Sequence, residues 1–239
     1  MPTTVSVIGA GRIAAPVIAH IRQSPDLRLG RILTRGHDPD IADGVTELGA
    51  FLDAPADIVI EAAGPAALRQ YGLDIPARSE LWTVGASALA DDDFRRKIRD
   101  LAEKHARPMR LFSDWIAAAD QCVPGVPARL KLRAARPQLG DRPGVLYEGP
   151  LREAARRFPD DVNSAVAAAL CGSGLDNTVI EIIDSGPGGE HAIRAEIEIG
   201  DLRLTTEVDL AAAASGNVHP VAGALIAALE RRTQPFRYG

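Results

Sequence analysis

VSVIGAGRIA, residues 5–14, decides the fold of this chain. It begins with a largely apolar run that is typical of a buried strand, and the run ends at the glycines Gly9 and Gly11. Beyond this turn, apolar residues recur at helical spacing through residues 13–21. A strand, a glycine turn and a helix in this order match G-x-G-x-x-G/A, the fingerprint of a unit that binds a dinucleotide.

Each position of the turn has a physical role in this interpretation. Gly9 permits a tight strand-to-helix turn, Gly11 lets the backbone approach a pyrophosphate, and Ala14 is small enough for close packing of helix on strand. The free N–H groups at the start of the helix suit the phosphates. The alternative is a turn with a purely structural role. The predicted cofactor-binding residues of the turn are Gly9, Gly11, Arg12 and Ile13.

The second element of the fingerprint departs from the NAD pattern. An acidic residue roughly 20 positions further on, at the end of the second strand, would bind the ribose 2′-hydroxyl of NAD. Here residues 31–36 read RILTRG, with Thr34 and Arg35 where the carboxylate is expected. A guanidinium suits a 2′-phosphate, so both residues are predicted to bind the cofactor, and NADP is slightly favoured over NAD. The alternative is that Arg35 is a solvated loop residue.

Further apolar runs alternate with helical segments through the first half of the chain. The predicted strands are residues 27–33, 58–60, 80–84 and 109–112. Asp91 or Asp92 is placed to cap the next helix. The apolar stripe of that helix consists of Phe94, Ile98 and Leu101. Strands that alternate with helices predict an α/β fold with a doubly wound parallel sheet.

The pattern changes to a period of two in the second half of the chain. Apolar and polar residues alternate through residues 193–199 and again through 202–210, and a Gly-Asp pair separates the two runs as a hairpin turn. This turn makes Ile199 face Leu202, so that both apolar rows lie on one side of the sheet. We expect a largely antiparallel sheet that is covered on one face.

These patterns predict two domains. An N-terminal Rossmann domain, residues 1–112, is completed by a C-terminal helix, residues 216–239. Residues 113–215 form a second, α+β domain on the largely antiparallel sheet, which serves substrate binding and dimerisation.

The composition is that of an ordinary globular enzyme. Of 239 residues, 46% are hydrophobic and 25% are charged, and the net charge of −5 argues against a nucleic-acid partner. No apolar segment reaches the roughly 20 residues that span a bilayer, so we expect no membrane partner and a cytoplasmic location. Cys122 and Cys171 have no zinc or Cys-x-x-Cys spacing, and no metal site is predicted.

Four segments in order along the chain resemble one known family. DIVIEAAG at residues 57–64 is similar to a strand that ends in VEAA beside the cofactor, and TVGASALAD at residues 83–91 is similar to an SVGALAD segment. FPDDVNSA at residues 158–165 looks like an FP-x-N-x-N-V-A helix start, and Glu190-His191 falls in a loop before a strand. The family is that of the L-aspartate dehydrogenases, in which a Rossmann domain is joined to a dihydrodipicolinate-reductase-like α+β domain.

The resemblance implies roles for individual residues. It places Ala63 and Gly64 beside the cofactor and Asn163 at the nicotinamide carboxamide, although Asn163 is also suited to cap a helix. It makes His191 the catalytic acid–base group, which fits a side chain that titrates near neutrality; the alternative is a surface-loop histidine. Trp115 is implied to lie where nicotinamide and substrate meet.

The implied reaction is the NAD(P)-dependent oxidation of the CH–NH2 group of a small amino acid, with L-aspartate giving iminoaspartate and then oxaloacetate and ammonia. Asp114 and Trp115 stand where the family has small residues, which predicts a narrower and more negative pocket. Two alternatives stay open: a reductase or imine reductase of the same fold with a different small substrate, and a non-catalytic NAD(P)-binding sensor. The family also implies a homodimer.

Overall fold

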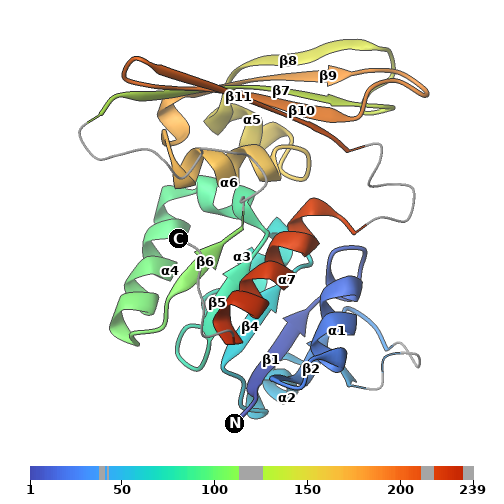
Figure 1. The fold of residues 1–239 in the computed structure, drawn as a ribbon, viewed down its shortest axis with the longest axis vertical. Coiled ribbons are helices and arrows are strands. Elements are labelled where there is room, and N and C mark those ends of the chain that lie inside the picture. The colour runs from blue at the N-terminus through green and yellow to red at the C-terminus, as the bar shows by residue number, and fades with distance from the viewer. Residues whose placement is uncertain (38–40, 42, 113–125, 211–217, 234–239) are drawn as a thin grey trace. The chain divides into compact units, whose positions relative to one another are not determined.

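The chain folds around two β-sheets, one in each of two compact units (Figure 1). The first unit consists of residues 1–112 and 218–239, and the second of residues 113–217. The computed structural model describes residues 1–37, 41, 43–112, 126–210 and 218–233 of the chain.

The first sheet contains parallel strands in the order β3-β2-β1-β4-β5-β6. These strands are β1 (Thr3–Ile8), β2 (Leu27–Leu33), β3 (Gly44–Val45), β4 (Ile58–Glu61), β5 (Glu80–Thr83) and β6 (Met109–Leu111). The predicted doubly wound parallel sheet is therefore confirmed, and β3 is an addition to the predicted strands.

Burial on both faces explains the apolar runs of the central strands. Val5 in β1 and its partner Ile58 in β4, on one face, are completely buried, and Val59, on the other face, is 1% exposed. The chain runs outward from β1 through β2 to β3, then continues on the other side of β1 with β4, β5 and β6. The strand order therefore reverses between β1 and β4, which is where doubly wound sheets bind ligands.

The helices described in this unit are α1 (Ala14–Gln23), α2 (Leu48–Asp53), α3 (Pro65–Tyr71), α4 (Asp92–Lys104) and α7 (Pro220–Thr233), with the short 3-10 helix η1 (Ala86–Ala90). Helices α1, α4 and α7 of this unit lie where the sequence pattern predicts helices, and α2 and α3 are additions. Asp91 caps α4, because its Oδ1 accepts hydrogen bonds from the backbone N–H groups of Asp93 at 3.0 Å and Phe94 at 3.1 Å. On α4 only Ile98 is fully buried among the described side chains.

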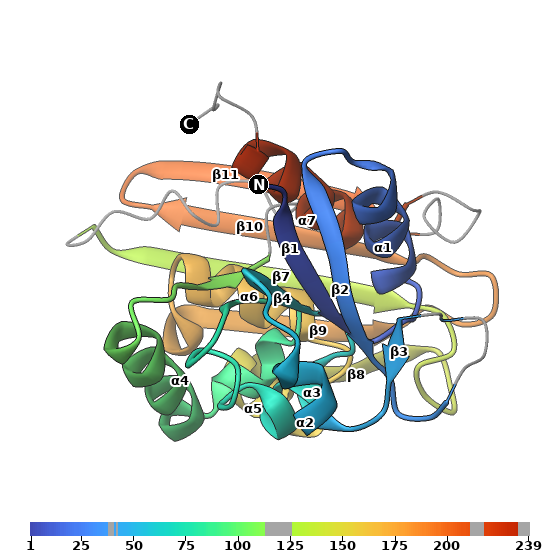
Figure 2. The same cartoon turned by 90° about the horizontal axis from the view of Figure 1, so that it is seen from below.

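The last helix, α7, returns to the first unit and lies beside α1 (Figures 1 and 2). His20 Nε2 of α1 lies 2.9 Å from Glu230 Oε1 of α7, and Arg232 pairs with Glu80 of β5 at 2.7 Å. Helix α7 begins at Pro220 rather than at residue 216. At this start, His219 Nδ1 accepts a hydrogen bond from the N–H of Val221 at 3.2 Å.

The second sheet is mixed, in the order β11-β10-β7-β9-β8. Its strands are β7 (Ala128–Arg136), β8 (Gly144–Pro150), β9 (Thr178–Asp184), β10 (Ala192–Ile199) and β11 (Leu202–Asp209). Three neighbouring pairs are antiparallel, and β7 with β9 is parallel. The predicted α+β domain on a largely antiparallel sheet is therefore confirmed, with one parallel pair that the sequence pattern did not indicate.

The β10–β11 hairpin has the predicted register. Ile199 pairs with Leu202, and Gly200 in the turn has a φ of 56°. Ile193 and Ile197 are buried whereas Arg194 is exposed. One face of β10 is therefore packed and the other faces solvent. The helices α5 (Leu151–Arg157) and α6 (Asn163–Cys171) lie against one face of this sheet, and the 3-10 helix η2 (Leu175–Asn177) follows α6 (Figures 1 and 2).

In the part of the chain that the structure describes, no helix is both long and apolar enough to cross a membrane.

Candidate functional site

The glycine turn lies at the carboxyl end of β1, as the fingerprint requires. Gly9 has a φ of 102°, a backbone conformation that favours glycine, and its N–H donates to the carbonyl of Leu33 in β2 at 2.8 Å. A Cβ on Gly9 would lie 3.0 Å from the Cβ of Ala63. Glycine at this position therefore permits both the turn and the close approach of the loop after β4.

Gly11 differs from Gly9, because the protein itself does not require glycine there. Apart from its two chain neighbours, no described residue has an atom within 4 Å of a Cβ built on Gly11, and the φ of Gly11 lies outside the positive range. The open space above Gly11 therefore fits a ligand that approaches the backbone, and the fold alone does not explain the residue. Ala14 is fully buried at the start of α1, as close packing of helix on strand demands.

The two other predicted residues of the turn are positioned differently. Arg12 is exposed, and Ile13 is half-buried as the N-cap residue of α1. Within the described residues, the Arg12 guanidinium forms no hydrogen bond or ion pair. It is therefore available to an anionic ligand.

A buried carboxylate, Glu61, organises the loops that follow β4 and β5. Glu61 Oε1 accepts hydrogen bonds from the N–H of Ala63 at 2.8 Å and of Gly64 at 2.6 Å. Oε2 accepts from Thr83 Oγ1 at 2.6 Å and from the N–H of Gly85 at 3.2 Å. One side chain therefore fixes both loops at the carboxyl edge of the sheet.

The surroundings of Glu61 act on its pKa in opposite directions. Burial raises the pKa of the Glu61 carboxyl, although the hydrogen bond from Thr83 and those from the Gly64, Ala63 and Gly85 backbone act to lower it. A Cβ on Gly85 would lie 2.8 Å from Glu61 Oε2. Glycine in the segment that follows β5 is therefore explained by the approach of this carboxylate.

The loop after β4 carries the two predicted residues Ala63 and Gly64. Gly64 has a φ of 103° and is the N-cap residue of α3. The N–H of Ala62 donates to the carbonyl of Ile8 at 3.0 Å, which joins this loop to the end of β1. Ala63 and Gly64 thus lie at the same edge of the sheet as the glycine turn.

A cavity of about 270 Å³ lies beside the ends of β2 and β3. It is lined by Thr34, His37, Gly44, Val45, Thr46, Glu47 and Ala50. Thr34 Oγ1 donates to the carbonyl of Gly36 at 2.8 Å, which fixes the turn after β2. Arg35 is exposed, is not one of the lining residues and, among the described residues, forms no hydrogen bond or ion pair.

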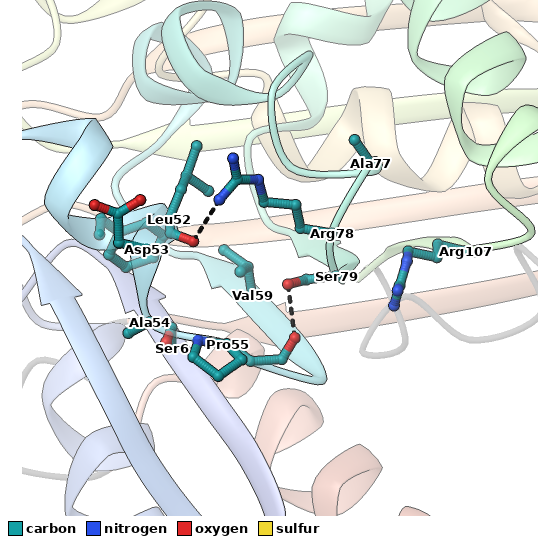
Figure 3. Close-up of a pocket in the computed structure, with 12 residues that line it drawn as sticks. Ser6, Leu52, Asp53, Ala54, Pro55, Val59, Ala77, Arg78, Ser79 and Arg107 are labelled. Carbon is teal, nitrogen blue, oxygen red and sulfur yellow. Dashed lines mark hydrogen bonds between the residues drawn. The ribbon is translucent and has the colours of Figure 1, made fainter.

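A larger cavity, of about 410 Å³, lies at the end of the sheet opposite to the glycine turn (Figure 3). Its lining includes residues just before β4, β5 and β6, at the amino-terminal ends of the strands. Arg78 donates to the carbonyl of Leu52 at 2.8 Å and Ser79 Oγ donates to that of Ala56 at 2.7 Å, as the dashed lines show. Because doubly wound sheets bind ligands at the carboxyl ends of their strands, we assign this cavity no part in cofactor binding.

In the second unit, His191 lies directly before β10 and is half-buried. Its carbonyl accepts a hydrogen bond from the N–H of Leu210 at 2.6 Å. The preceding residue, Glu190, is held through its carbonyl by Ser185 Oγ at 2.5 Å and through its carboxylate by Arg133 at 2.9 Å. The backbone that carries His191 is therefore fixed on both sides.

Asp184 anchors the loop that leads to His191. The carboxylate is 2% exposed and accepts hydrogen bonds from the N–H groups of Gly186 at 2.8 Å, Gly140 at 2.8 Å and Gln138 at 3.1 Å. These hydrogen bonds, with that from Gly186 the largest cause, lower the pKa of the Asp184 carboxyl.

Asn163 is the first residue of α6, and the N-cap position belongs to Val162. Asn163 therefore lies inside the helix rather than at the capping position. Trp115 and Asp114 lie outside the described residues.

The structure brings one group of predicted residues together at one edge of the first sheet. Gly9, Gly11, Arg12, Ile13, Thr34, Arg35, Ala63 and Gly64 follow the carboxyl ends of β1, β2 and β4, on either side of the reversal in strand order. Asn163 and His191 belong to the second unit. The first group offers glycine backbone, small side chains and free cations, which suits a dinucleotide.

Sequence reasoning did not single out Glu61, Glu47 or Asp184. Glu61 and Asp184 share a usable signal, because each is an acidic residue that ends an apolar strand. A carboxylate at that position is costly to bury unless backbone N–H groups meet it. Glu47 gives no such signal, because β3 is too short to be predicted.

Comparison with known families covers both halves of the chain. Residues 127–232 match the family described as "Aspartate dehydrogenase, C-terminal", and residues 9–111 match the "Homoserine dehydrogenase, NAD binding domain". The first unit thus carries a domain of the nicotinamide-dinucleotide-binding kind.

Individual relatives agree with the family models. An L-aspartate dehydrogenase of Ruegeria pomeroyi is 32% identical and covers 85% of this chain and 82% of its own. L-aspartate dehydrogenase 1 of Bordetella pertussis is 30% identical over 94% of each chain. The crystal structure of aspartate dehydrogenase from Thermotoga maritima has the same fold, with a TM-score of 0.79, 20% identity and full coverage of both chains.

Proposed function

Because the chain belongs to the L-aspartate dehydrogenase family, we propose that it is an NAD(P)-dependent oxidoreductase that acts on the CH–NH2 group of L-aspartate. The products are iminoaspartate and, after hydrolysis, oxaloacetate and ammonia. The observation that carries the proposal is that the relatives named for this activity align with 85% and 94% of the chain. The glycine turn at the reversal in strand order is consistent with it.

The residues at the carboxyl ends of the strands of the first sheet leave open space for the cofactor. A side chain on Gly11 would fill a space in which no atom of the described residues, its two chain neighbours apart, lies within 4 Å of the Cβ. A bound nicotinamide cofactor supplies the acceptor for the hydride that leaves the amino-acid Cα. The residues proposed to hold it are Gly9, Gly11, Arg12, Ile13, Thr34, Arg35, Ala63, Gly64, Trp115 and Asn163.

We propose that NADP is slightly favoured over NAD. Arg35 is exposed at the end of β2 and unpaired within the described residues, which suits a 2′-phosphate.

His191 is proposed as the catalytic acid–base group. The backbone on either side of it is fixed by hydrogen bonds to Leu210 and Glu190, so the side chain starts from a defined position. A histidine exchanges protons near neutrality, as the oxidation of an amine requires.

Three further parts of the proposal rest on the sequence and the family. They are a homodimer, a substrate and dimerisation domain of residues 113–215, and a location in the cytoplasm. The residues Asp114 and Trp115 favour a second candidate function, in which the same fold reduces a different small substrate.

The experiment is a fluorescence titration with NADH and NADPH, followed by a turnover screen of amino acids and keto acids. Gly11→Val should abolish cofactor binding without unfolding the chain, because the new side chain meets no protein atom within 4 Å of its Cβ. Gly223→Val in α7, where a Cβ is equally free, is the matched control. Unchanged affinity in a folded Gly11→Val variant would refute the cofactor site, and cofactor binding without any turnover would favour a sensor.

A further inference from the structure

We propose that Glu47 favours NAD(H) and so limits the preference for NADP that Arg35 gives this chain. Its carboxylate would accept a hydrogen bond from the adenosine ribose of NAD(H) and repel the 2′-phosphate of NADP(H). The inference rests on the proposed function, because it requires a nicotinamide dinucleotide on the glycine turn. It explains why a preference for NADP based on Arg35 is only slight.

The position of Glu47 follows from the register of β2 and β3. Leu33 pairs with Val45 in parallel, and the N–H of Thr34 donates to the carbonyl of Val45 at 2.9 Å. Arg35 and Glu47 each come two residues after this last pair. Neighbouring strands lie about 4.8 Å apart, so a cation and an anion leave the sheet at the same level from adjacent strands.

Neither side chain has a polar partner among the described residues, and Glu47, the N-cap residue of α2, forms no side-chain capping hydrogen bond. Across the described residues, the Glu47 carboxylate and the Arg35 guanidinium form no hydrogen bond or ion pair, with each other or with another side chain. Glu47 lines the cavity of about 270 Å³ together with Thr34, whereas Arg35 does not. The carboxylate therefore borders the space beside the end of β2, where the adenosine ribose would lie.

The chemistry of the two cofactors makes Glu47 selective. A carboxylate only accepts hydrogen bonds, so it suits the ribose hydroxyls of NAD(H) and not the acceptor oxygens of a 2′-phosphate. In dinucleotide-binding folds this acid usually comes from the end of the second strand. In this chain Thr34 stands there, and the acid instead follows the next strand, β3, as the N-cap residue of α2.

The magnitudes are measurable. Glu47→Gln turns a hydrogen bond to a charged acceptor into one to a neutral acceptor, and the difference corresponds to about tenfold in affinity, which sets the expected weakening for NADH. Repulsion between two like unit charges about 4 Å apart in water weakens binding by about fivefold. Removal of the Glu47 charge should therefore strengthen NADPH binding by about this factor. The NADPH effect should shrink at high salt.

The test measures the dissociation constants of NADH and NADPH for the unmodified chain and for Glu47→Gln. The variant should bind NADH about tenfold more weakly and NADPH about fivefold more tightly. Glu47→Asp keeps the charge and should keep the NADPH affinity of the unmodified chain. The matched control is Glu103→Gln, which removes an exposed carboxylate of α4 that lines neither cavity.

The outcomes separate this inference from the proposed function. If the unmodified chain binds both cofactors and Glu47→Gln changes their ratio less than twofold, the assignment of Glu47 is overturned while the cofactor site stands. If the unmodified chain binds neither cofactor, the cofactor site fails and the role of Glu47 fails with it. A ratio that shifts equally in Glu103→Gln also overturns the assignment, because a general charge effect then explains it.

Discussion

Replacement of Glu61 should loosen the cofactor site and destabilise the first unit together. The carboxylate holds four donors: the N–H groups of Ala63, Gly64 and Gly85, and the hydroxyl of Thr83. In Glu61→Leu the buried hydroxyl of Thr83 and the part-buried N–H groups of Ala63 and Gly64 lose this acceptor. A buried donor without a partner costs about 1–3 kcal/mol. With the Thr83 hydroxyl counted in full and the two part-buried N–H groups together as one, we expect a loss of about 2–6 kcal/mol in the free energy of unfolding.

Glu61→Gln should be milder. The remaining oxygen serves the Ala63 and Gly64 N–H groups, the new amide donates to Thr83 Oγ1, and Gly85 keeps Thr83 Oγ1 as a second acceptor at 2.9 Å. The charged hydrogen bonds become neutral ones, which corresponds to about 1–3 kcal/mol. Urea unfolding followed through the fluorescence of Trp82, which is buried in β5, measures the difference.

The pH dependence of stability gives an independent check on Glu61. Because burial raises its pKa above the ordinary value of 4.5, the folded state binds the proton more tightly than the unfolded chain does. The contribution of Glu61 to stability is therefore complete below pH 4.5 and decreases as the pH rises through the raised pKa. Glu61→Gln lacks this dependence, so its deficit relative to the unmodified chain should be smaller at pH 8 than at pH 5. A deficit that grows with pH, or cofactor affinity unchanged in Glu61→Leu, would contradict the role of Glu61.

Three further predictions concern the cofactor and the substrate. Arg35→Ala should weaken NADPH binding by roughly ten- to a hundredfold, the worth of a charge-assisted phosphate contact, and leave NADH binding unchanged in the same titration. His191→Ala should lower turnover by roughly 10²–10⁴-fold with cofactor affinity preserved; full activity would remove the catalytic assignment. The double change Asp114→Gly and Trp115→Ala should speed L-aspartate oxidation in a steady-state assay, and slower turnover would contradict the pocket argument.

Local patterns were sufficient to predict much of the first unit. Gly9 and Ala14 act through their own backbone and size, so their roles are readable within residues 5–14. The β10–β11 register was readable for the same reason, because a two-residue turn determines which residues face each other.

Features that depend on residues far apart in the sequence could not be predicted. The donors that meet Glu61 Oε2 lie 22 and 24 positions along the chain. The parallel pairing of β7 with β9 depends on the path of the chain between the two strands. The alternation of apolar and polar residues within a strand does not encode this path. Within the site, the glycine positions follow from sequence, whereas the carboxylates that organise or border it depend on tertiary structure.

The return of α7 to the first unit has a consequence for biosynthesis. Arg232 and Glu80, which pair across this unit, are 152 positions apart in the chain. On a ribosome, residues 113–217 emerge in full before α7 does, so the second sheet can form while α1 still lacks its contact with α7. The nucleotide-binding fold, which is encoded first, is therefore completed last. A nascent chain that stops short of residue 220 leaves the part of α1 that α7 covers open to chaperones or to other chains.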